Sequence, residues 1–132
     1  DIGFLDRSQS LIDLLVADNE YILGLGLSHQ ELAIPLRYAM TIDNHNYAQE
    51  FEFKGNVFNI TSIGCMGRQD SPFEDGTFTH RDYTLTNLRT GKAISFSGLV
   101  PMMIERYGFY EGNTEHRVEP SDIIQIFGLL SA

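Results

Sequence analysis

The spacing of apolar residues predicts two helices in the first third of the chain. Between residues 6 and 26, leucines and isoleucines recur at near-helical spacing and end at glycines that supply a stop. A second helix is predicted to begin at Ser28, because a serine followed three residues later by Glu31 is typical of a capping box. Pro35 removes a backbone donor and crowds the preceding turn, so we expect this second helix to be short or kinked.

The middle of the chain changes to the alternation that is typical of β-strands. Residues 51–63 alternate apolar and polar positions around a turn at 54–56, which predicts a hairpin. Residues 83–96 repeat this arrangement around a turn at 89–91 that contains a glycine. Four strands in successive hairpins predict an antiparallel meander, whose apolar face needs flanking helices as a cover.

Two short helices are predicted to close the chain. Pro101 and Pro120 each suit a first helical position, and Gly108 and Gly128 suit the positions after the last turn. The fold class is therefore α+β: a four-stranded antiparallel meander flanked by two N-terminal and two C-terminal short helices. No linker or low-complexity stretch separates these segments, so residues 1–132 are predicted to form a single globular domain.

The charge balance argues against nucleic acid as a partner. Nine basic residues against eighteen acidic ones give a net charge of −9, and residues 1 to 52 alone hold nine acids and two bases. Nucleic-acid binding depends on neutralising phosphates with lysine and arginine, so we expect no nucleic-acid binding and no attraction to an anionic membrane surface. Pro35 also interrupts a helix-turn-helix pattern that the segment after Ser28 would otherwise suggest.

Apolar runs and cysteine content favour a soluble protein of the cytoplasm. The longest apolar runs, such as residues 98–104, are far shorter than the roughly 20 residues that cross a bilayer. Cys65 is the only cysteine, so no intrachain disulfide can form, and a reducing compartment is favoured. We therefore expect a cytoplasmic location and no membrane partner.

Residues 64–83 concentrate reactive side chains in what the pattern predicts to be a connection between the two hairpins. Cys65 and His80, at its two ends, have the chemistry of a nucleophile and base pair or of two soft-metal ligands. The chain has no short-spaced Cys or His pairs, so we commit to no metal site and favour Cys65 as a core residue. The connection is long for a hairpin loop, and its length is unexplained.

The entry to the third predicted strand is a second candidate. Alternation places His80 and Asp82 on one face, where the carboxylate could orient the imidazole for base catalysis or anion binding. A charged edge strand is the favoured alternative. Six residues are candidate ligand-binding positions: Arg68, Asp70, His80, Arg81, Asp82 and Arg106.

Three further segments each have a structural and a functional interpretation. The start of the helix at Pro101 could bind an anion together with Arg106, although most helix starts bind only water. Residues 107–110 could form an aromatic partner surface, but a core position is favoured. Residues 43–47 have the composition of a polar turn whose hydrogen bonds are satisfied.

These patterns favour a non-enzymatic binding or protein-interaction domain. None of the recognised short catalytic or nucleotide-binding motifs is present, so we expect no cofactor. The partner would be an unknown protein or a second copy of the chain in a homodimer. The alternative is a small enzyme, or a metal or anion site, built around residues 65–82.

Overall fold

The structure is a computed structural model that describes residues 11–71, 73–110 and 118–130, with the backbone alone described for residues 11, 65–69 and 80. It belongs to the α+β class, with two helices before the sheet and two after it, as the sequence predicts. In chain order the elements are α1 (Leu11–Gly24), α2 (His29–Ile42), β1 (Gln49–Phe53), β2 (Asn56–Asp70), β3 (Phe78–Asn87), β4 (Ala93–Ser97), α3 (Val100–Tyr107) and α4 (Pro120–Phe127).

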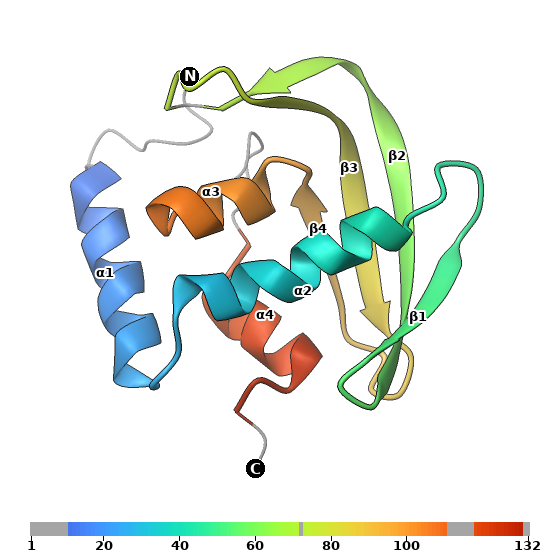
Figure 1. Ribbon diagram of the computed structural model, residues 1–132, viewed down its shortest axis with the longest axis horizontal. Helices are drawn as coiled ribbons and strands as arrows, with labels where there is room; N and C mark the ends of the chain where they lie inside the picture. Colours follow the sequence, from blue (N-terminus) through green and yellow to red (C-terminus); the bar gives the residue numbers. More distant parts are fainter. Residues whose placement is uncertain (1–10, 72, 111–117, 131–132) are drawn as a thin grey trace.

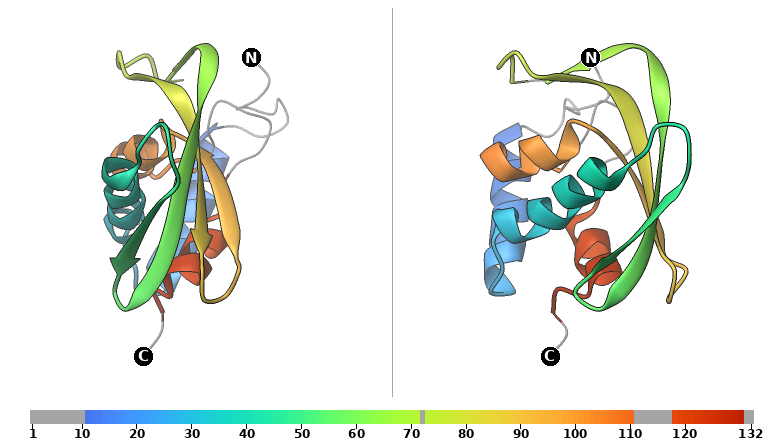
Figure 2. Two further views of the ribbon diagram at one scale, coloured as in Figure 1. Left: turned by 90° about the vertical axis from the view of Figure 1, so that its right-hand side faces the viewer. Right: turned by 45° about the vertical axis from the view of Figure 1, so that its right-hand side comes forward.

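The sheet is an antiparallel meander in the order β1-β2-β3-β4. Helices α2, α3 and α4 cover one of its faces, and α1 lies on the far side of these helices from the sheet (Figure 1). The two turned views in Figure 2 show the same layers. No helix in the described ranges is both long and apolar enough to span a bilayer.

Both predicted turns are confirmed. Phe53 pairs with Asn56 across Lys54 and Gly55, whose φ angles of 51° and 84° suit a two-residue hairpin turn that follows the twist of the strands. Between β3 and β4 the tight turn includes Gly91 with a φ of 80°. Because these signals are local, they were readable without knowledge of the rest of the fold.

One apolar core joins the sheet to its helical cover. On the covered face of the sheet, Phe58, Ile60 and Leu85 are fully buried, while the intervening residues of β3 and β4 are more exposed. Phe109 and Tyr110 are also fully buried, so the predicted partner surface at residues 107–110 is wrong and the core alternative is confirmed. The apolar residues of these segments hold the helices on the sheet.

Helix α2 begins at the predicted capping box and is longer than a short helix. The Ser28 hydroxyl accepts a hydrogen bond from the Glu31 backbone N–H, and the Glu31 carboxylate accepts one from the Ser28 backbone N–H. The helix then continues through Pro35 for a total of 14 residues, so of the two alternatives, short or kinked, the short helix is wrong. Pro35 is itself buried, and packing of this apolar face outweighs the loss of one helical hydrogen bond.

The predicted connection at residues 64–83 is mostly strand, which corrects the sequence-based interpretation. β2 continues to Asp70 and β3 begins at Phe78, so only residues 71–77 form the turn. The register is interrupted after Gly64, where residues 65–68 lie opposite a single residue of β3. This irregularity lets the hairpin bend over the helical layer (Figure 1). Residues 64–83 are long because they form the end of this bent hairpin.

Candidate functional site

The six predicted site residues lie on three elements: Arg68 and Asp70 on β2, His80, Arg81 and Asp82 on β3, and Arg106 on α3. In β2, the backbone of Arg68 lies in the irregular stretch and Asp70 is the exposed last residue. In β3, Asp82 pairs with both Ile63 and Ser97, so the favoured edge-strand interpretation is wrong at this residue. Arg106 lies in the last turn of α3, away from the helix start at which an anion was predicted. Among the predicted residues whose side chains are described, Arg81 is the one that belongs to the candidate site.

The backbones of Cys65 and His80 lie close together in the sheet. Gly64 pairs with Arg81, so the backbones of Cys65 and His80 lie at the same level of neighbouring strands. Their side chains fall outside the described part of the structure, as does that of Arg68. Among the described residues, no group of three or more histidines, cysteines and acids is placed to hold a metal ion.

The side chain of Arg81 reaches the neighbouring strand β2. Its Nε–H donates a hydrogen bond of 2.9 Å to the Ser62 hydroxyl oxygen. Arg81 and Tyr83 are two residues apart in β3 and therefore share one face of the sheet, and the ring of Tyr83 is buried on that face. The sequence pattern thus placed Arg81 on the correct strand face without indicating its partner.

The Ser62 hydroxyl in turn donates to Asp43, which caps the end of α2. The distance from Ser62 Oγ to Asp43 Oδ2 is 2.7 Å, and the Asp43 backbone N–H donates to the carbonyl of Ala39. The side chain of Asp43 has no solvent exposure. A guanidinium, a hydroxyl and a carboxylate therefore form a chain of hydrogen bonds from the sheet to the end of the helix.

The second oxygen of this carboxylate has no partner. Asp43 Oδ1 is buried and, among the described residues, is the one buried side-chain nitrogen or oxygen without a hydrogen bond. A buried polar atom left without a partner costs about 1 to 3 kcal/mol, more when it carries charge. The prediction that residues 43–47 form a fully satisfied polar turn is therefore wrong at this atom.

The position of Asp43 at the helix end adds a second unfavourable contribution. The C-terminal end of a helix carries partial negative charge, so a carboxylate there is disfavoured by about 0.3 to 1 kcal/mol. The last turn of α2 contains no basic residue to offset it. A buried carboxylate that breaks two rules of stability is the pattern expected of a functional residue.

The turn after Asp43 is held by its own hydrogen bonds. The side-chain oxygen of Asn44 accepts from the Asn46 backbone N–H, and the Asn44 carbonyl accepts from the Tyr47 N–H. His45 Nε2 lies 3.6 Å from Asp43 Oδ2, and its side chain is 59% exposed. These bonds fold the turn beside the carboxylate without supplying a donor to Oδ1.

Two surface hollows flank this turn. One, of about 560 Å³, is lined by Asp43 and by amide side chains. The other, of about 160 Å³, is lined by the same turn together with Thr61 and Ser62 of β2. The residues lining the larger hollow are Ile42, Asp43, Asn44, His45, Asn46 and Gln49.

The charges of Asp43 and Arg81 both affect the pKa of Tyr83. Burial raises the pKa of the Tyr83 phenol, and the negative charge of Asp43 raises this pKa further, while the positive charge of Arg81 opposes both effects. Tyr83 therefore stays protonated at neutral pH. It is a buried neutral residue close to the charges of Asp43 and Arg81.

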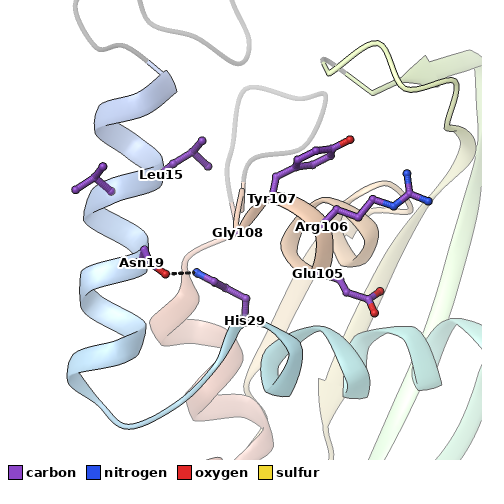
Figure 3. A pocket seen from close by; sticks show the side chains of 8 residues that line it. Leu15, Asn19, His29, Glu105, Arg106, Tyr107 and Gly108 are labelled. Carbon is purple, nitrogen blue, oxygen red and sulfur yellow. Dashed lines mark hydrogen bonds between the residues drawn. The ribbon is translucent and has the colours of Figure 1, made fainter.

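A third hollow, between α1 and the end of α3, offers less to a ligand (Figure 3). In this hollow of about 430 Å³, His29 Nδ1 lies 2.7 Å from the Tyr110 hydroxyl and Nε2 lies 3.1 Å from Asn19 Oδ1. Burial lowers the pKa of His29, partly offset by Asp18. Gly108 is required here, because a Cβ atom would lie 2.8 Å from the His29 ring.

The charged residues around this third hollow are already paired. Glu105 binds Arg37 at 2.7 Å, and Arg106 lies 3.6 Å from Asp75 of the β2–β3 turn. Figure 3 shows the side chains of Arg106 and Tyr107 directed away from α1. This hollow therefore presents satisfied groups, whereas the turn after α2 contains an unsatisfied one.

Sequence reasoning missed Asp43 and Ser62 as site residues. Ser62 lies 19 positions from Asp43 and meets it only through the strand register. One local signal was available, since an aspartate at the end of a predicted helix is disfavoured by the helix dipole. Comparison of the chain with protein-family models, curated proteins and solved structures gave no match.

Proposed function

We propose that this protein is a non-enzymatic binding domain that holds a small polar ligand at Asp43. The observation that carries the proposal is the buried Asp43 Oδ1 without a hydrogen-bond partner. A ligand that donates a hydrogen bond to this atom would remove the cost of leaving it unsatisfied. The hollows on both sides of the adjoining turn supply room for such a ligand.

The hydrogen-bond directions support binding more than nucleophilic catalysis. A nucleophilic serine needs a general base that takes its proton and is itself oriented by an acid. Here Ser62 donates directly to Asp43, and Arg81 occupies one of its lone pairs. His45 stands beside the same carboxylate oxygen rather than between it and Ser62. Ser62 thus positions Asp43 and is not activated.

Ligand entry requires the turn to move. Asp43 Oδ1 has less than 1 Å² of exposed surface, so no ligand reaches it in the closed arrangement. The turn side chains are the exposed part of the site, with His45 at 59% and Tyr47 at 70% exposure. Rearrangement of this turn disturbs few buried contacts, which makes it the route of access.

The charge of the chain supports a small ligand or a protein as the partner. A net charge of −9 opposes binding to nucleic acid, and the lone Cys65 favours the cytoplasm as the location. Self-association stays a prediction, as does the alternative of a small enzyme or metal site between Cys65 and Asp82. Sedimentation of the purified chain and elemental analysis test these two predictions.

Amide chemical shifts test the proposed function directly. Uniformly ¹⁵N-labelled protein is titrated with a panel that contains an amine, an amino acid, a guanidine, a carboxylate, a sugar and inorganic phosphate. We expect at least one compound to shift the amide signals of residues 43–47 and of Ser62, and the same compound to leave Asp43→Asn unaffected. If no member of the panel moves these signals, the proposed function is wrong.

A further inference from the structure

We infer that the group recognised at Asp43 is a primary ammonium. This inference rests on the proposed function and names the ligand chemistry. The unpartnered Asp43 Oδ1 is a hydrogen-bond acceptor, so the group that binds there has to be a donor. A charged N–H donor forms a shorter and stronger hydrogen bond to a carboxylate than a neutral donor does.

The surroundings of Asp43 favour positive charge. The carboxylate and the negative end of the α2 dipole act at the same point, because Asp43 is the capping residue of that helix. Both repel a phosphate or a carboxylate. A cation placed at Oδ1 is attracted by both, and the absence of solvent around the Asp43 side chain strengthens that attraction.

The hollow beside Asp43 matches the remaining N–H groups of an ammonium. A primary ammonium carries three donors, of which Oδ1 takes one. Asn46 and Gln49 line the same hollow, and each has an amide oxygen that accepts hydrogen bonds. Once the turn has moved to admit the ligand, Oδ1 and these two amide oxygens would offer three acceptors for the three donors of the group.

A metal ion fits these residues less well. Calcium and magnesium take six or more oxygen ligands, usually with several carboxylates. Asp43 is the single acid that lines the hollow, and its Oδ2 already accepts from Ser62. Nor do the described residues elsewhere gather three metal-binding side chains. An organic cation needs only the one free oxygen that Asp43 provides.

Two sources supply a primary ammonium, and Arg81 distinguishes them. The Arg81 guanidinium lies one hydrogen bond beyond Ser62, so opposite charges stand at the two ends of the Asp43–Ser62–Arg81 chain. A simple amine uses the Asp43 end alone. An amino acid would add a carboxylate near Arg81, and this second contact would make it the tighter ligand.

The test compares cations that differ in hydrogen-bond donors. The full-length ¹⁵N-labelled chain is titrated with ethylammonium, glycine, tetramethylammonium, acetate and magnesium as their simple salts. We expect ethylammonium and glycine to shift the amide signals of residues 43–47 and of Ser62. Tetramethylammonium has the same charge without an N–H donor, and we expect it to bind at least about tenfold more weakly than ethylammonium.

A pair of variants separates the site from general charge effects. Asp43→Asn should weaken ethylammonium binding by about tenfold or more, because it removes the charge from the acceptor. Glu52→Gln changes an exposed carboxylate on β1, outside the hollows, and should leave the affinity unchanged. The comparison of ethylammonium with tetramethylammonium on the unaltered chain needs no variant, so it holds even if Asp43→Asn does not fold.

Each outcome counts for or against the ammonium assignment. Equal binding of the two alkylammonium ions, unchanged affinity in Asp43→Asn, or shifts produced by acetate or magnesium alone would overturn it. If neither amine binds but another panel compound moves the same signals, the ammonium assignment fails and the binding function stands. Tighter binding of glycine than of ethylammonium identifies an amino acid as the source, and the reverse identifies a simple amine.

Discussion

Two aspartates of this protein, Asp75 and Asp43, each have a hydroxyl and an arginine nearby, but they differ in how many of their carboxylate oxygens accept hydrogen bonds. Asp75, in the β2–β3 turn, accepts from the backbone N–H and the hydroxyl of Thr77 at one oxygen and from the Tyr107 hydroxyl at the other. Arg106 lies 3.6 Å from that second oxygen. Asp43 also has a hydroxyl and an arginine nearby, yet only one of its oxygens accepts a hydrogen bond.

The difference separates a structural carboxylate from a functional one. Asp75 fixes the turn of the long hairpin to the end of α3, where the ring of Phe73 also stacks on that of Tyr107 at 3.9 Å. Every donor around it strengthens the fold. Asp43 also has polar neighbours, but they leave one buried oxygen for a group that the described chain does not supply. Residue composition alone does not distinguish the two.

The largest expected effect comes from Asp75→Asn. In either orientation of the new side chain, its NH₂ group faces a donor that cannot accept, namely the Thr77 N–H or the Arg106 guanidinium. We expect a lower urea midpoint and a lower melting temperature than in Asp43→Asn or Glu52→Gln. Amide exchange at Ser71 and Thr77, which are joined by a backbone hydrogen bond, should also become faster.

Asp43→Asn is the matched control for that measurement, because it makes the same substitution at the unsatisfied carboxylate. Equal losses of stability in both variants would contradict the distinction between them. A normal urea midpoint for Asp75→Asn would show that the turn does not depend on its hydrogen bonds to the helix.

The helices, the meander and its turns were predictable because their signals are local. A capping box at Ser28, glycines after the last helical turns and the Lys54–Gly55 turn each act over a few residues. The extension of β2 to Asp70 was missed because it depends on pairing across an interrupted register with β3. Strand pairing through a bulge leaves no simple alternation in the sequence.

The site was less predictable than the fold, for the same physical reason. Arg81 was identified as a candidate from its strand position, but its partner Ser62 is 19 residues away. The unsatisfied oxygen of Asp43 exists only because the register brings Ser62 to its other oxygen. A missing hydrogen bond is a property of the assembled fold, so sequence reasoning could identify a suspicious aspartate at a helix end and no more.

At low pH, protonation of Asp75 should weaken its hydrogen bonds and lower the stability of the fold. We expect this effect to be smaller than that of Asp75→Asn and larger than that of Asp43→Asn. Hydrogen bonds from Thr77 and then Tyr107 hold the pKa of Asp75 well below its usual 3.8. The unfolded chain therefore takes up this proton before the folded protein does, so stability falls as pH decreases. The contribution is complete above about pH 5 and is lost progressively below the usual pKa.

The measurement is the difference in unfolding free energy between the unaltered chain and Asp75→Asn, from pH 7 downward. Burial also lowers the pKa of His29, which makes both proteins less stable as pH falls below its usual 6.5, and the subtraction removes this shared contribution. We expect a constant difference above about pH 5 and a shrinking one at lower pH. A difference that grows with acid has the wrong sign for a lowered pKa and would refute the assignment.

The smallest expected effect on stability is that of Asp43→Asn in the absence of ligand. Its amide oxygen keeps the hydrogen bond from Ser62, and the change removes a negative charge from the C-terminal end of α2. The NH₂ group takes the place of an oxygen that already lacked a partner, so no existing hydrogen bond is lost. We expect the unfolding free energy to change by less than about 1 kcal/mol in urea titrations. A loss of unfolding free energy as large as that of Asp75→Asn would mean that the Asp43 carboxylate stabilises the fold. Such a result would contradict the assignment of Asp43 as a binding residue.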